Sequence, residues 1–92
     1  MSVDVEIYMN NIKKFFRENP KDLLNLVPKE KEKEFYFKVR EMASSNVENG
    51  KEVSLTQKQM IEICRELNQK QTVDFELQGV FQKTKFGEFC LN

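Results

Sequence analysis

The chain contains no histidine and no tryptophan, and it has only two cysteines, two prolines and three glycines in 92 residues. Without histidine it lacks the commonest general base and the commonest nitrogen ligand for metals. A serine–histidine or cysteine–histidine catalytic pair cannot form within the chain. Two cysteines without histidine cannot complete a tetrahedral zinc site in one subunit. We therefore expect no catalytic residues, no metal site and no enzyme activity.

The few glycines also exclude the common nucleotide-binding motifs. Gly50, Gly79 and Gly87 are widely separated and form neither a dinucleotide fingerprint nor a phosphate loop. No cofactor is therefore expected, and an enzyme would have to use Asp, Glu, Lys or Tyr alone. The alternating lysines and glutamates of residues 29–34 are typical of a solvated helix surface, since lysine separates each pair of carboxylates.

Long hydrophobic runs are missing as well. No stretch approaches the ~18–20 apolar residues of a spanning helix, so we expect no membrane contact. Residues 1–11 carry Asp4 and Glu6 where a secretory signal would carry positive charge. Two cysteines do not make the disulfide framework of a small secreted domain. These absences predict a cytoplasmic protein.

The charge is balanced, with 15 basic and 15 acidic residues and a formal net charge of zero. A neutral chain has no overall field to attract nucleic acid, and it lacks one barrier to self-association. The length favours a single small domain covering residues 1–92, and 39% apolar residues exclude a chain that is disordered throughout.

The apolar residues change their period near residue 71. Before that point they recur every three to four positions, and beyond it they alternate, which predicts helices followed by strands. We predict an α+β fold, mainly helical, with helices at about 4–18, 20–27, 28–49 and 55–69 and a C-terminal β-hairpin at about 72–91. An isolated hairpin is only marginally stable in water, so it must pack on the helices or pair with another chain.

Local residues indicate where the helices begin and end. Asn19 is a candidate cap for the second helix, with Pro20 at its first position. Gly50 is suited to close the third helix, because glycine readily adopts the left-handed conformation. Two pairs have the spacing of a capping box at the start of the fourth helix, Ser54 with Gln57 and Thr56 with Gln59.

The cysteines receive different predictions. Cys64 lies on the apolar face of the fourth helix, which favours a buried structural role. Cys90 has the parity of the polar residues in the predicted hairpin, which favours exposure.

Four apolar residues do not fit the predicted core faces, namely Ile7, Phe37, Val80 and Phe86. Such residues either contact a partner or a second copy, or are buried because a thin domain covers two faces of one helix. We treat them as a candidate interface, and we predict a small non-enzymatic protein–protein interaction module acting as an adaptor, inhibitor or self-assembling subunit.

The alternative is a winged-helix-like nucleic-acid-binding protein. The third and fourth helices would form a helix-turn-helix, and the hairpin tip with Lys83 and Lys85 would serve as the wing. Neutral charge and the glutamates Glu62 and Glu66 on the fourth helix argue against it. The sequence therefore favours a protein partner or self-association over nucleic acid.

Overall fold

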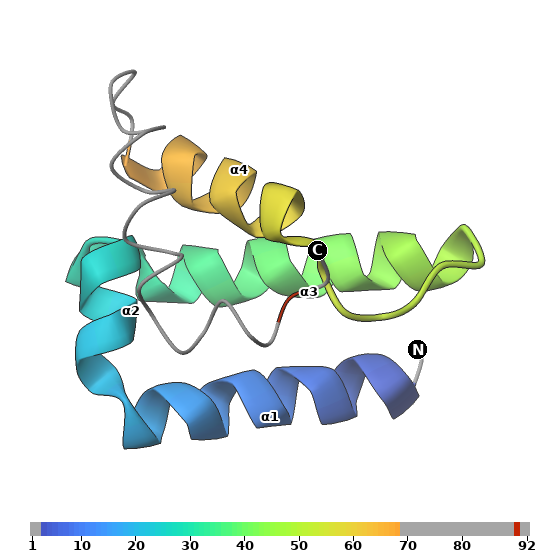
Figure 1. Cartoon of the computed structure of the whole chain (residues 1–92), viewed down its shortest axis with the longest axis horizontal. Coiled ribbons are helices and arrows are strands. Elements are labelled where there is room, and N and C mark those ends of the chain that lie inside the picture. The colour runs from blue at the N-terminus through green and yellow to red at the C-terminus, as the bar shows by residue number, and fades with distance from the viewer. Residues whose placement is uncertain (1–2, 69–89, 91–92) are drawn as a thin grey trace.

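A computed structural model describes residues 3–68 and residue 90 of the chain (Figure 1). The elements are α1 (Val3–Glu18), α2 (Pro20–Leu26), the 3₁₀ helix η1 (Lys29–Lys31), α3 (Glu32–Glu48) and α4 (Gln57–Asn68). No strand occurs among the described residues, and the predicted helical body is confirmed. The predicted hairpin at about 72–91 lies outside the described residues, apart from Cys90.

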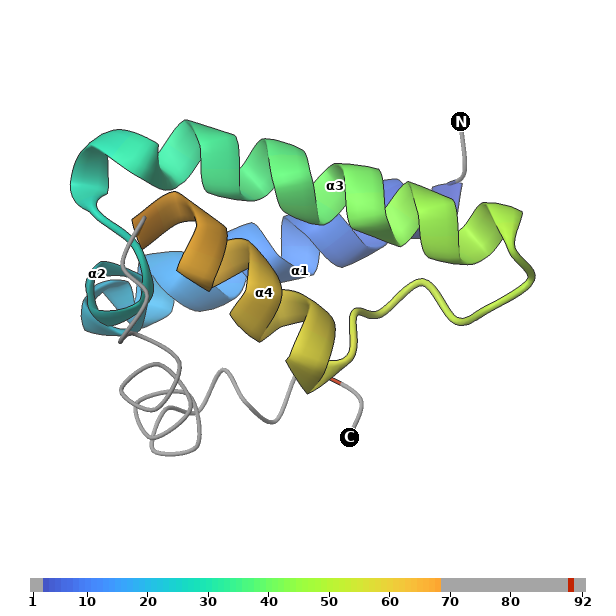
Figure 2. The same cartoon turned by 90° about the horizontal axis from the view of Figure 1, so that it is seen from above.

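Helix α3 is the centre of the arrangement. It packs against α1 on one side and against α4 on the other. Both neighbours run in roughly the opposite direction to α3, and α2 closes the end of the domain where α1 finishes and α3 begins (Figures 1 and 2). This topology brings one face of each long helix to a common interior.

The core is built from one apolar face of each long helix. On α1 the buried residues are Val5, Tyr8, Met9, Ile12 and Phe16, and on α4 they are Met60, Ile63, Cys64 and Leu67. Phe35, Val39 and Ala43 of α3 are fully covered between these two faces. Phe16 and Phe35 meet edge to face with ring centroids 5.9 Å apart, an arrangement that aromatic pairs prefer.

The junction between α1 and α2 differs from the prediction. Asn19 occupies the position before α2 and Pro20 begins the helix, but the Asn19 side chain caps nothing there. Its Nδ2 instead donates to the Phe15 carbonyl at 3.0 Å, which satisfies an acceptor at the end of α1. Asn19 therefore terminates the preceding helix, and the predicted cap of α2 is wrong.

The predicted helix at 28–49 is divided at its start. Pro28 has extended backbone angles, with φ −60° and ψ 148°, and the Lys31 N–H bonds its carbonyl at 2.9 Å. This i→i+3 bond makes a 3₁₀ turn, after which Lys31 leaves helical geometry with ψ 5°. The α-helix therefore begins at Glu32, four residues later than predicted.

The end of α3 follows the prediction closely. Gly50 has φ +75°, and its N–H bonds the Val47 carbonyl at 3.0 Å. The Lys51 N–H bonds the Asn46 carbonyl at 2.8 Å, which completes a Schellman motif. Glycine is needed here because other residues rarely adopt a positive φ.

Of the two predicted capping boxes at the start of α4, the structure forms the one between Thr56 and Gln59. The Gln59 N–H bonds Thr56 Oγ1 at 3.1 Å, and the Thr56 N–H bonds Gln59 Oε1 at 3.0 Å. At the other end of α4, Asn68 Nδ2 donates to the carbonyls of Leu26 and Cys64 at 2.8 and 2.7 Å. This amide ties the end of α4 to the end of α2.

Candidate functional site

Two of the four candidate interface residues, Ile7 and Phe37, lie in the part of the chain that the structure describes, and both are exposed. Ile7 is 53% exposed and Phe37 is 60% exposed, so neither side chain is buried inside the domain. Val80 and Phe86 lie outside the described residues. Two further large apolar side chains, Val3 on α1 and Leu24 on α2, are also exposed.

Ile7 and Phe37 belong to different surfaces. Glu6, which pairs with Arg40, marks the side of α1 that faces α3. Ile7 lies about 100° further around α1, turned away from α3, and Val3 precedes it by one turn. Phe37 lies about 160° from the buried Val39 on the outer face of α3. The structure therefore does not bring Ile7 and Phe37 into one patch.

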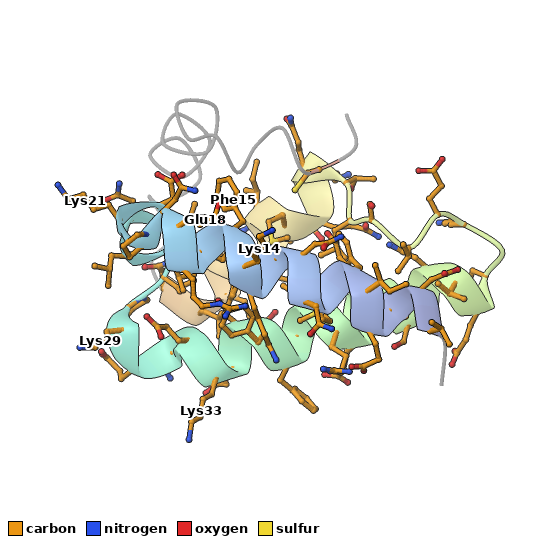
Figure 3. All side chains as sticks on the ribbon, turned by 90° about the horizontal axis from the view of Figure 1, so that it is seen from below. Lys14, Phe15, Glu18, Lys21, Lys29 and Lys33 are labelled. Atoms are coloured by element: carbon orange, nitrogen blue, oxygen red, sulfur yellow. The ribbon has the colours of Figure 1, made fainter. Side chains whose placement is uncertain are left out.

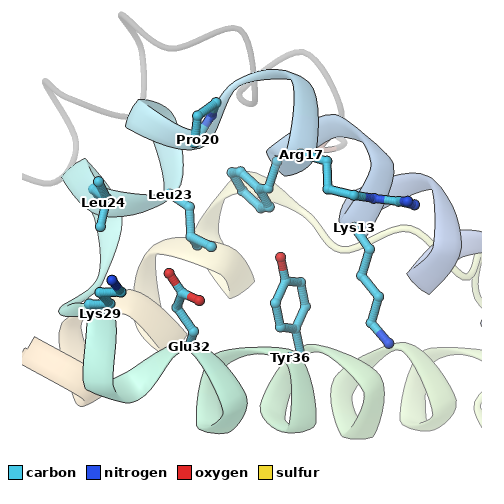
Figure 4. Close-up of a pocket in the computed structure, with 9 residues that line it drawn as sticks. Lys13, Arg17, Pro20, Leu23, Leu24, Lys29, Glu32 and Tyr36 are labelled. Carbon is cyan, nitrogen blue, oxygen red and sulfur yellow. The ribbon is translucent and has the colours of Figure 1, made fainter.

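A pocket of about 420 Å³ opens between α1, α2 and the start of α3 (Figure 4). Buried Phe16 and Leu23 provide apolar walls, and half-exposed Leu24 stands at its α2 side. The described residues that line it are Lys13, Phe16, Arg17, Pro20, Leu23, Leu24, Lys29, Glu32 and Tyr36. Its size and apolar walls are typical of ligand-binding pockets.

The charges around this pocket are mainly positive. Lys13, Arg17 and Lys29 line it together with a single carboxylate, Glu32. None of these three basic side chains forms an ion pair with another residue in the described part of the chain. Lys29 lies at one end and Lys13 and Arg17 at the other, with Glu32 and Tyr36 between them (Figure 4). The pocket therefore has cations toward both ends, and both apolar and polar side chains between them.

Tyr36 carries the hydroxyl group inside the pocket. Burial raises its pKa above 10, the Glu32 carboxylate raises it further, and Arg17 opposes both. Lys13 Nζ lies 5.8 Å from the centroid of the Tyr36 ring, at cation–π distance. Tyr36 is consequently a neutral donor or acceptor at physiological pH, with one face of its ring occupied by a cation.

A second, shallower groove of about 330 Å³ lies between α3 and α4. Its lining residues are Lys38, Glu41, Met42, Ser45, Ile63 and Glu66. Lys38 Nζ and Glu66 Oε1 are 3.1 Å apart, so its one cation is already paired with a carboxylate. The remaining charged group among the described lining residues is the Glu41 carboxylate, so this groove has no cluster of unpaired charges of one sign to select a ligand.

The two cysteines are free thiols in the core. Cys64 is fully buried, as predicted, and burial raises its pKa to about 12. Cys90 is only 7% exposed, so its predicted exposure is wrong, and burial raises its pKa to about 12 also. The parity argument assumed an extended strand at residue 90, but the chain has a bend at this residue, so alternation along the chain does not decide which side chain is buried. High pKa values and burial make both thiols poor nucleophiles.

The described residues contain no group of three or more His, Cys, Asp or Glu side chains placed to hold a metal ion. Within the same ranges, none of the helices has the length and apolar character needed to cross a bilayer. No protein-family model matches the chain, and neither a curated protein nor a solved structure is significantly similar to it.

Sequence reasoning missed the pocket entirely. Lys13 and Arg17 come from α1, Lys29 from η1, and Tyr36 from α3, and each alone is typical of a solvated helix surface. The one sequence signal was the i,i+4 spacing of Lys13 and Arg17, which places two cations on one flank of α1. The packing of α2 and of the start of α3 against that flank completes the pocket, because it adds an apolar wall from Leu23 and the third cation, Lys29.

Proposed function

We propose that this chain is a small non-enzymatic protein–protein interaction module that acts in the cytoplasm as an adaptor, an inhibitor or a self-assembling subunit. The observation that carries the proposal is the position of Phe37. It is 60% exposed near the middle of the central helix α3, while Phe35 and Val39 on either side are fully buried. An exposed aromatic side chain on a rigid helix offers a large contact area, and aromatic residues often dominate interface energetics.

The titratable groups support a non-enzymatic role. The hydroxyl of Tyr8 and the thiols of Cys64 and Cys90 have pKa values raised to about 12 by burial. They remain protonated at physiological pH, whereas a nucleophile or general base needs a pKa near the working pH or below it. The chemistry available to these groups is therefore packing and hydrogen bonding.

The predicted hairpin at about 72–91 belongs to the same proposal. Val80 and Phe86 would extend the interface, and the hairpin would pack on the helices of its own chain. Burial of Cys90 in the core beside Tyr8 and Cys64 supports packing within one chain over pairing with another.

The test compares Phe37→Asp with Ile7→Asp. Both changes put the same charge at an exposed apolar position, but on different helices and different surfaces. Phe37→Asp should leave the circular dichroism spectrum unchanged while abolishing self-association in light scattering or capture of a partner from host lysate, because it places an unpaired charge in a desolvated contact. Ile7→Asp should preserve that association.

Other outcomes have distinct meanings. A folded Phe37→Asp protein with unchanged mass and unchanged partner capture would remove Phe37 from the interface. Loss of association in Ile7→Asp alone would move the interface to the outer face of α1.

A further inference from the structure

We propose that the pocket between α1, α2 and α3 binds an acidic peptide segment of a partner protein, in which an apolar side chain is flanked by carboxylates. The inference rests on the proposed function for its class of partner, but it uses different residues from the Phe37 surface. Lys13, Arg17 and Lys29 face the pocket without a carboxylate partner among the described residues.

Charge placement determines the form of the ligand. The cations lie toward both ends of the pocket with Leu23 between them (Figure 4), and Phe16 also contributes to the lining. A peptide crossing the pocket would place its carboxylates at the two ends and its apolar side chain at the centre. Arg17 can hold a carboxylate with two parallel hydrogen bonds, whereas the lysines act as point charges.

The pocket fits an acidic peptide better than a nucleic acid. Its walls are largely apolar and would leave a phosphate backbone poorly solvated. Glu32 lies between the cations and would repel a nucleic-acid strand, because such a strand carries negative charge along its whole length. A peptide can avoid this repulsion, because its central residue is uncharged and its backbone N–H groups can donate to the Glu32 carboxylate.

The test uses a fluorescently labelled pool of short peptides in which Leu, Ile, Phe or Trp is flanked on both sides by Glu or Asp. Binding to the full-length chain is followed by fluorescence anisotropy at low and physiological salt. The acidic pool should bind and weaken as salt rises, because the contacts are exposed charges. A matched pool with Gln and Asn in place of the acids should not bind.

The charge variants localise the site. Lys13→Gln/Lys29→Gln should weaken binding by about tenfold or more, since exposed ion pairs contribute modestly and there are two of them. The control, Lys14→Gln/Lys33→Gln, removes the same charge from exposed lysines that do not line the pocket (Figure 3). It should bind nearly as the unaltered chain does.

Glu32→Gln provides a readout of opposite sign. Glu32 is the one carboxylate among the described lining residues, so its removal should tighten binding of the acidic pool a few-fold by ending a like-charge repulsion. A purely structural role of Glu32 would instead leave affinity unchanged or lower it. Circular dichroism establishes that each variant is folded.

The outcomes separate this inference from the proposed function. Phe37→Asp should bind the acidic pool normally, so failure of the Phe37 surface does not imply failure of the pocket. No binding of the acidic pool, or equal losses in the two double-lysine variants, would overturn the pocket assignment. Tighter binding of a single-stranded oligonucleotide than of the acidic pool, lost in Lys13→Gln/Lys29→Gln, would replace the peptide by a nucleic acid.

Discussion

The side-chain amides of Asn46 and Gln59 bond to each other in both directions, at 3.2 and 3.1 Å. Asn46 is only 5% exposed, and Gln59 Oε1 also accepts the Thr56 N–H. One glutamine thus closes the start of α4 and joins it to the end of α3. The connection across residues 49–56 is held by these polar contacts as well as by packing, because a buried amide is costly unless its hydrogen bonds are made.

This amide pair predicts a measurable coupling. Asn46→Ala and Gln59→Ala should each lower the free energy of unfolding by about 1–3 kcal/mol, because each leaves a partner amide unsatisfied. The double variant should lose less than the sum, with a coupling of about 0.5–3 kcal/mol. Urea denaturation of the four proteins measures it. If the loss in the double variant equalled the sum of the two single losses, the two amides would not stabilise each other.

The Tyr8 hydroxyl gives a second prediction. It accepts the backbone N–H of fully buried Leu55 at 3.1 Å. Tyr8→Phe should therefore cost about 1–3 kcal/mol of unfolding free energy, because the amide loses its partner. The matched control is Tyr36→Phe, at a partly buried tyrosine whose hydroxyl bonds no described residue, and it should change stability by less than ~0.5 kcal/mol. Equal effects in thermal melts would contradict this role for Tyr8.

Alkaline pH should weaken the fold. The pKa of Cys64 is raised from 9.0 to about 12 and that of Tyr8 from 10.0 to about 12, mainly because burial disfavours their charged forms. Below pH 9 the folded and the unfolded chain both keep these protons, so these groups do not lower the free energy of unfolding. The unfolded chain releases the Cys64 proton above pH 9 and the Tyr8 proton above pH 10, whereas the folded chain retains both up to about pH 12. The free energy of unfolding therefore falls by up to about 1.4 kcal/mol per pH unit for Cys64 between pH 9 and 12, and for Tyr8 between pH 10 and 12.

The measurement is urea denaturation at pH 8, 9 and 10, with Cys64→Ala as the comparison. The alanine variant should be less stable at every pH, because it leaves a cavity, but its loss between pH 9 and 10 should be smaller. Identical pH slopes in the two proteins would argue against a buried, neutral Cys64.

These contacts show which parts of the structure local sequence can predict. The glycine stop at Gly50 and the capping box at the start of α4 depend on residues within a few positions of one another. The glycine stop is confirmed, and one of the two predicted capping boxes, Thr56–Gln59, is formed. The Asn46–Gln59 bond and the basic pocket join residues that only tertiary packing brings together. Cys90 shows the same limit, since its burial depends on where the chain returns to the core and not on local parity.

A nucleic-acid binding assay distinguishes the proposed protein–protein interaction module from the winged-helix alternative. A protein with 6–10 phosphate contacts loses roughly 10³–10⁵ in affinity between 50 and 200 mM salt. We predict no measurable binding to single-stranded or duplex DNA or RNA at physiological salt, because the chain has no net positive charge. Salt-sensitive binding that disappears in Lys83→Glu/Lys85→Glu would instead support the winged-helix alternative.

The last prediction concerns the C-terminal segment. Cys90 lies in the same core cluster as Tyr8, Met9 and Cys64, so the end of the chain contributes to the interior of the helical body. Deleting residues 72–92 should therefore expose part of that interior and lower the melting temperature. Burial of one large apolar side chain contributes about 1.5–3 kcal/mol, a large fraction of the total stability of a small domain.

The comparison for this deletion is Cys90→Ala in the full chain, which removes one buried thiol and keeps the rest of the segment. It should cost less than the deletion if other residues of the segment also pack on the helices. If the truncated protein melts at the same temperature as the full chain, the segment contributes nothing to the fold, and the proposal of a hairpin that packs within its own chain is wrong. A truncated protein that melts lower but still captures its partner would show that the segment stabilises the domain without forming the interface, which would remove Val80 and Phe86 from the proposed surface.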